Sequence, residues 1–254
     1  MKKEGKCRIC GMIGPLTFEH IPPRGALNSS LSMLYSGEEL IKRLYAGDVD
    51  PTKGLRYKTL QQGYGQHALC QKCNNNTGSF YAPHYNELAK AVVAKLKNED
   101  FNSSIENREM NIKVRGMNGL AVFKQIISMF CSTSNTDLFI DEFKDFILDQ
   151  KSTQFKRDRW SVHMYINAGS RIHGSSGVMA SMYGKQTEVF PLVGAEVLTN
   201  PFGFVLIDQL TTSPQLQSLV HVIGGNITEM STMPYCEQSV ELNIPFRKKP
   251  FLMI

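Results

Sequence analysis

Two Cys-x-x-Cys pairs constrain the fold of this chain more than any other feature. They are Cys7 with Cys10, and Cys70 with Cys73. Two thiolates separated by two residues fit a tight turn around a metal ion, and two such turns supply the four ligands of a tetrahedral structural zinc. The first residues include no apolar stretch typical of a signal peptide, so we expect a cytoplasmic protein whose cysteines stay reduced. We therefore predict one zinc site instead of disulfides.

The chain divides into two parts that differ in composition and in residue pattern. Residues 1–98 contain four of the six cysteines and many turn-forming residues. This is typical of a small module whose thin apolar core depends on a bound metal. The long separation of the pairs predicts an insertion near residues 27–62, with a helix over Ser36–Ala46. A second helix is predicted over Tyr85–Asn98, where apolar residues recur at helical spacing.

Residues 99–254 predict a second domain. Part of 99–118 is interpreted as a junction with a strand at Met110–Val114, and helices are predicted over 119–133 and 137–150. Segments rich in β-branched and aromatic residues then predict strands at 160–168, 178–183, 187–193, 203–208 and 239–246. The predicted class is α+β, with a zinc module followed by an α+β domain with a mainly antiparallel sheet. Substrate recognition, homo-oligomer formation and regulation by a partner all stay open for this domain.

The charge is compatible with a polyanionic partner. The formal net charge is +5, and lysine and arginine dominate phosphate binding. Within the N-terminal module, positive residues alternate with tyrosines, a pattern that suits phosphate contact and base stacking but also an ordinary solvated surface. These residues are Arg24, Lys42, Arg43, Lys53, Arg56, Lys58 and Lys72. No apolar run reaches the roughly 18 residues that span a bilayer, so we expect no membrane partner.

A carboxylate and an imidazole stand side by side at Glu19 and His20. They lie on a predicted short strand, Leu16–Ile21, in which successive side chains point to opposite faces. Both can face one point only if the backbone bends. The following Pro22 and Pro23 cannot continue a strand and favour such a bend.

Asn74 directly follows the last cysteine of the second pair, where a helix could begin. A metal that clamps both pairs would bring Asn74 near Glu19 and His20. Carboxylate and amide oxygens suit Mg²⁺ or Mn²⁺, and a neutral imidazole can take a proton from water. The combination indicates metal-assisted phosphodiester hydrolysis. The simpler alternatives are a surface charge at Glu19, a strand-end residue at His20 and a helix cap at Asn74.

This order of motifs resembles the zinc-stapled branch of the HNH (ββα-metal) endonucleases. The resemblance covers about residues 5–90 and implies that Glu19 and Asn74 hold a catalytic Mg²⁺ or Mn²⁺. It also implies that His20 is the general base, that the four cysteines bind structural zinc, and that the substrate is nucleic acid, for which we expect DNA.

The chain departs from the family pattern at two positions. Glu19 stands where the family usually has aspartate or histidine. Gly65 stands where many members have an asparagine that orients the base, and the sequence does not identify a substitute. We expect nucleic-acid contacts from Arg24, Lys72 and His67, although a packed or solvated role for His67 stays equally open.

Two other functions compete with a nuclease. One is a non-catalytic zinc-ribbon protein that binds nucleic acid or acts as an adaptor, and it is favoured if Glu19 and His20 point away from Asn74. The other is an effector nuclease switched on by a partner through residues 99–254, as in phage defence, which is an analogy only.

Overall fold

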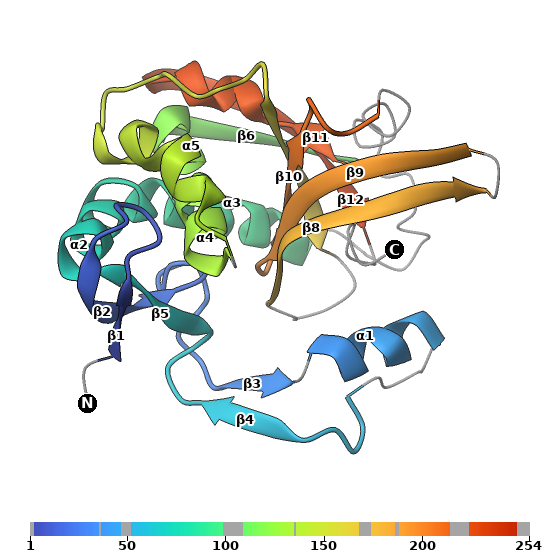
Figure 1. Ribbon diagram of the computed structural model, residues 1–254. Coiled ribbons are helices and arrows are strands. Elements are labelled where there is room, and N and C mark those ends of the chain that lie inside the picture. The colour runs from blue at the N-terminus through green and yellow to red at the C-terminus, as the bar shows by residue number, and fades with distance from the viewer. Residues whose placement is uncertain are drawn as a thin grey trace.

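The structure is a computed structural model that describes residues 3–35, 37–46, 52–98, 109–134, 136–167, 174–185, 188–213 and 224–247. It confirms the α+β class with mainly antiparallel sheets. A small N-terminal sheet lies on one side of the molecule and a larger sheet on the other, with helices between them (Figure 1). No helix in the described part of the chain is long and apolar enough to cross a membrane.

The N-terminal sheet carries both cysteine pairs. Its strands are β1 (Lys3–Lys6), β2 (Ile13–His20) and β5 (Gly65–Cys70), in the order β1-β2-β5. The first pair lies in the turn between β1 and β2. The second lies where β5 passes directly into helix α2 (Gln71–Phe80), which is followed by α3 (Ala82–Asn98). The predicted helix at 85–98 is therefore present and begins three residues earlier.

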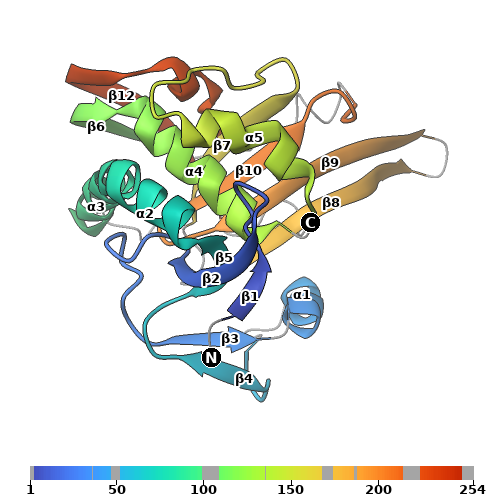
Figure 2. The same cartoon turned by 60° about the vertical axis from the view of Figure 1, so that its left-hand side comes forward.

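The segment between the pairs forms a separate arm. It contains β3 (Ser32–Tyr35) and β4 (Tyr57–Leu60), which pair with each other, and helix α1 (Gly37–Ala46). This helix confirms the predicted helix over 36–46, although Ser36 itself lies outside the described residues. Figures 1 and 2 show the arm projecting from the rest of the molecule.

The larger sheet has seven strands. Its order is β6-β12-β7-β10-β9-β8, and the short β11 pairs with β7. Every pairing is antiparallel except the short parallel contact between β12 and β7. The strands are β6 (Glu109–Asn118), β7 (Trp160–Asn167), β8 (Gly174–Lys185), β9 (Glu188–Leu198), β10 (Phe202–Asp208), β11 (Gly225–Asn226) and β12 (Tyr235–Arg247). All the predicted strands are thus present, most of them longer than expected.

Helix α4 (Gly119–Thr133) is the centre of the molecule. Fourteen of its residues are buried, from Gly119 to Ser132, as expected for a helix that other elements cover on all sides. It contacts α2, α3, β5 and α5 (Leu138–Leu148), while the 3-10 helix η1 (Thr228–Thr232) packs near its start. One core of buried side chains includes residues from both sides of the expected boundary at 98, and the two-domain division stays a prediction.

The N-terminal sheet is also tied to α5 by charge. Asp137 accepts hydrogen bonds from Lys6 at 2.7 Å and from Arg8 at 3.5 Å, and these cations lower its pKa. Asp137 occupies the N-cap position of α5, but its side chain makes no capping hydrogen bond. It links the first cysteine turn to the rest of the fold instead.

Candidate functional site

The four cysteines of the two pairs form one cluster. All their sulfur atoms lie within 4.8 Å of one another, and the Cys10 and Cys70 sulfurs are 3.8 Å apart. A tetrahedral zinc with Zn–S bonds of about 2.3 Å places its sulfurs about 3.8 Å apart. A hydrogen bond from Cys73 lowers the pKa of Cys7 to about 4, so the cluster favours a thiolate. The predicted ligand set is therefore assembled, and its geometry fits a metal ion.

Backbone contacts explain how the first cysteine turn closes. The Cys7 amide donates to the Met12 carbonyl, and the Gly11 amide donates to the Cys7 carbonyl, both at 2.9 Å. Gly11 has a φ of 76°, a conformation that favours glycine. The Arg8 amide donates to the Ala68 carbonyl at 3.0 Å, which joins this turn to β5. The metal-binding turns are thus held together by main-chain bonds as well.

A β-bulge lies just before the candidate catalytic residues. Thr17 pairs with Leu69, whereas the next residue, Phe18, pairs with His67, so Ala68 has no partner on β2. A bulge bends the strand pair and increases its twist. Glu19 and His20, the next two residues, both line one pocket. The predicted meeting of Glu19 and His20 at one place is therefore seen in the structure, at the end of β2 just before the prolines.

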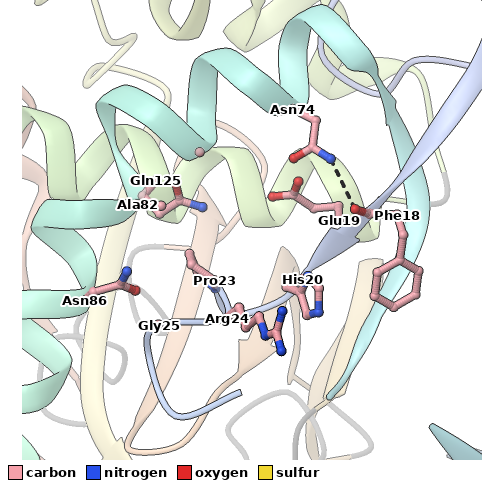
Figure 3. A pocket seen from close by; sticks show the side chains of 11 residues that line it. Phe18, Glu19, His20, Pro23, Arg24, Gly25, Asn74, Ala82, Asn86 and Gln125 are labelled. Atoms are coloured by element: carbon pink, nitrogen blue, oxygen red, sulfur yellow. Dashed lines mark hydrogen bonds between the residues drawn. The ribbon is translucent and has the colours of Figure 1, made fainter. Parts of the chain in front are cut away.

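Asn74 lies in the first turn of α2 and is held against β2. Its amide nitrogen donates to the Thr17 hydroxyl at 2.9 Å and to the Phe18 carbonyl at 3.1 Å. Figure 3 shows the Asn74 side chain beside the Glu19 carboxylate, with the bond to Phe18 drawn as a dashed line. Because Cys70 occupies the N-cap position of α2, Asn74 does not serve as the helix cap.

The Glu19 carboxyl group is almost completely buried, with 5% of the residue exposed. Burial, and to a smaller extent the negative charge of Cys7, raise its pKa to about 8, so without a bound cation the group is mostly protonated at neutral pH. Within the described residues, no basic side chain pairs with this carboxylate and no group donates a hydrogen bond to it. A buried carboxylate requires a compensating charge. A divalent cation held between Glu19 and Asn74 fits this requirement.

The His20 ring is oriented by the backbone. Its Nε2 lies 3.0 Å from the Gln62 carbonyl oxygen. Since a carbonyl only accepts, Nε2 carries the hydrogen in this bond, and Nδ1 is left as the acceptor. A Cβ at Gly65 would overlap the Glu19 carbonyl oxygen, so no side chain fits there. The Gln62 carbonyl thus orients His20, and position 65 has no room for the asparagine that the HNH resemblance leads one to expect there.

Asn28 holds this orienting turn in place, a role that the sequence did not reveal. Its buried side chain donates to the Pro22 carbonyl at 2.6 Å and to the Tyr64 carbonyl at 2.7 Å. Its amide oxygen accepts from the Tyr64 backbone at 2.7 Å. These bonds connect the loop after His20 to the turn that contains Gln62.

The three predicted nucleic-acid contacts differ in position. Arg24 lines the pocket with Glu19 and His20. Lys72 and His67 are exposed and do not line it. The His67 ring lies edge-on to Phe18, with ring centres 5.5 Å apart. Only Arg24 is therefore placed to touch a molecule bound in the pocket.

The pocket has a volume of about 340 Å³ and extends beyond the predicted site residues. Its other polar lining includes Asn86 from α3 and Gln125 from α4. Sequence reasoning missed both. The adjacent polar residues Lys124 and Gln125 inside an otherwise apolar helix were the available signal.

The cysteine cluster, the bulged strand pair and the start of α2 thus bring Glu19, His20 and Asn74 to one pocket. Such a pocket can hold a divalent ion and a water molecule beside an imidazole. No family model matches the chain, and no curated protein or solved structure matches it.

Proposed function

We propose that this protein is a metal-dependent HNH-type endonuclease that hydrolyses phosphodiester bonds in nucleic acid, with DNA as the expected substrate. The supporting observation is the meeting of the buried Glu19 carboxyl group, which has no ionic partner among the described residues, with the anchored Asn74 amide and with His20 at one pocket. In this proposal, Cys7, Cys10, Cys70 and Cys73 bind structural zinc.

Each residue has a defined part in the proposed reaction. Glu19 and Asn74 would hold Mg²⁺ or Mn²⁺, which would supply charge stabilisation for the phosphate and the departing oxygen. His20, held through its Nε2 by the Gln62 carbonyl, takes a proton from the attacking water at Nδ1. Arg24, at the pocket edge, offers a positive charge to the phosphate backbone.

Glu19 is longer than the aspartate usual at this position in the HNH family, and it is buried. Its position nevertheless suits the proposed role as a metal ligand. Among the described residues nothing neutralises its carboxylate, although it lies beside Asn74 (Figure 3). The rival adaptor function requires no such arrangement and was favoured only by side chains that point away from Asn74. Control by a partner, a part in phage defence and a cytoplasmic location stay predictions.

The test is cleavage by the purified chain. Plasmid DNA, single-stranded DNA and RNA are incubated with Mg²⁺, Mn²⁺ or EDTA, and we expect metal-dependent cleavage that EDTA abolishes. The variant His20→Ala should lose about 100-fold or more of the rate, as removal of a general base predicts, while zinc content and circular dichroism stay unchanged.

His84→Ala is the control. His84 lies on α3 and does not line the pocket, so its removal should leave the rate within a few-fold of wild type. Undiminished cleavage by His20→Ala would remove His20 from the mechanism, and binding of nucleic acid without any cleavage would favour the adaptor function.

A further inference from the structure

Unpartnered polar atoms line the pocket on the side of α3 and α4. Gln125 is 1% exposed, and among the described residues neither its amide nitrogen nor its amide oxygen has a hydrogen-bond partner. The Asn86 amide oxygen is also buried and unpartnered. Buried polar groups are normally paired, because an unmade hydrogen bond costs free energy. Figure 3 shows both carboxamides on the side of Glu19 away from Phe18.

A glycine keeps the same region open. Gly78 lies within helix α2 and lines the pocket, and a Cβ at this position would have nothing within 4 Å. Glycine is unfavourable inside a helix, and here no close contact requires it. Gly25 differs, because a Cβ there would overlap the Asn86 side chain. The space beside Gly78 is therefore open to solvent and to a molecule bound in the pocket.

The pocket reaches beyond the place where a metal ion would lie. Its volume is about 340 Å³, and its lining continues from Glu19 and Asn74 to Asn86 and Gln125. The remaining space adjoins two carboxamides, and each carboxamide offers a donor and an acceptor side by side. This is the pattern with which glutamine and asparagine bind the edge of a nucleobase.

We propose that Gln125 and Asn86 form a subsite for one nucleobase of the substrate, unstacked from its neighbours, beside the phosphate that a metal ion at Glu19 and Asn74 would stabilise. This inference rests on the proposed nuclease function. A base inside a duplex is stacked and paired, so the subsite selects single-stranded or locally opened nucleic acid.

The test measures binding separately from cleavage. In a His20→Ala background with Mg²⁺, fluorescence anisotropy gives the affinity for single-stranded hexanucleotides of each base and for an abasic phosphodiester of the same length and charge. We expect Gln125→Met to weaken binding of at least one base-containing strand by about 10-fold, the scale of one bidentate base contact. Binding of the abasic strand should not change, and Gly78→Leu should act in the same way by filling the space.

Ser132→Ala is the matched control, because Ser132 is also buried and unpartnered on α4 but lies outside the pocket. It should leave every affinity unchanged. Thermal unfolding should show that Gln125→Met is folded and at least as stable as its parent, since it loses an unpaired amide.

Equal effects of Gln125→Met on the base-containing and abasic strands, or no effect on either, would overturn the subsite. If the parent protein nevertheless cleaves nucleic acid in Mg²⁺, the nuclease function stands without the subsite. Base-dependent binding through Gln125 in a chain that never cleaves would support the subsite and reject the nuclease.

Discussion

The Asn74 amide nitrogen donates to the Phe18 carbonyl oxygen at 3.1 Å and so joins the helix that follows the second cysteine pair to the strand that carries Glu19. A second bond from the same nitrogen, to the Thr17 hydroxyl, fixes the direction of the amide. With its nitrogen engaged on β2, the amide oxygen is left for the pocket. The same contact positions the residue and defines which of its atoms can bind a metal.

Replacing Asn74 with alanine should therefore weaken activation by Mg²⁺. We expect the Mg²⁺ concentration for half-maximal cleavage to rise by about 10-fold or more, as loss of a ligand or its support typically causes. Zinc content should not change. Asn76→Ala is the control, because Asn76 lies on the same helix but outside the pocket. Identical Mg²⁺ dependence of the two variants would remove Asn74 from the metal site.

Replacing Glu19 with glutamine should separate stability from activity. Burial raises the pKa of Glu19 to about 8, so without Mg²⁺ at pH 7 the group is mostly protonated and the neutral amide of the variant should leave the unfolding temperature about unchanged. Added Mg²⁺ should raise the unfolding temperature of wild type only, since a ligand stabilises the state that binds it. Calorimetry with and without Mg²⁺ measures both effects. An equal shift in both proteins would place the ion elsewhere.

Replacing Gly63 with alanine should change the orientation of His20 without changing the binding of zinc or Mg²⁺. Gly63 has a φ of 93°, and a Cβ there would overlap the Asn28 carbonyl, so the turn must move and carry the Gln62 carbonyl away from His20. Cleavage should fall about 10-fold or more, with normal zinc and Mg²⁺ binding. Nitrogen NMR of the imidazole should show that the Nε2-protonated tautomer no longer dominates.

Gly54→Ala provides the control for backbone strain in that experiment. Gly54 has a similar φ of 75°, but a Cβ there meets nothing within 4 Å. Both variants place alanine in an unfavourable conformation, and only one displaces the orienting carbonyl. Equal losses of activity in the two variants would show that the Gln62 bond is not needed.

The sequence predicted the parts of the site that depend on side-chain spacing. Both cysteine pairs, Glu19, His20 and Asn74 were identified from their order alone, and the cluster and the shared pocket follow from it. The Gln62 contact could not be predicted, because a backbone carbonyl has no residue signature. The bulge opposite Phe18 depends on pairing register, and Gln125 reaches the pocket only through the packing of α4. Long-range packing is what the local pattern does not encode.

Replacing Cys70 with serine should abolish the metal cluster. Zinc content should fall from one per chain to near zero, and the N-terminal sheet should lose its protection from hydrogen exchange, because zinc binding in small modules contributes on the order of 10 kcal/mol to folding. Cys236→Ser is the control, since Cys236 lies outside the cluster. Retention of one zinc by Cys70→Ser would show that the four sulfurs do not act together.

The buried Lys124 predicts how the free energy of unfolding depends on pH. Its ammonium group is buried and donates to the Phe146 carbonyl at 2.7 Å, and burial lowers its pKa from 10.5 to about 8. Between these values the folded chain has released a proton that the unfolded chain keeps. The unfolded state then binds more protons, so this group makes the free energy of unfolding rise as pH increases.

The comparison with Lys124→Met isolates this effect. The variant takes the Lys124 donor away from the Phe146 carbonyl and should be less stable at every pH. Its free energy of unfolding, however, should not show the increase with pH that Lys124 causes in wild type. The stability difference in favour of wild type should therefore grow by about 2 kcal/mol between pH 7 and pH 9.5, from about 1.4 kcal/mol for each pH unit above the folded-state pKa. Urea unfolding at several pH values measures it, and parallel curves would show that Lys124 keeps an ordinary pKa in the fold.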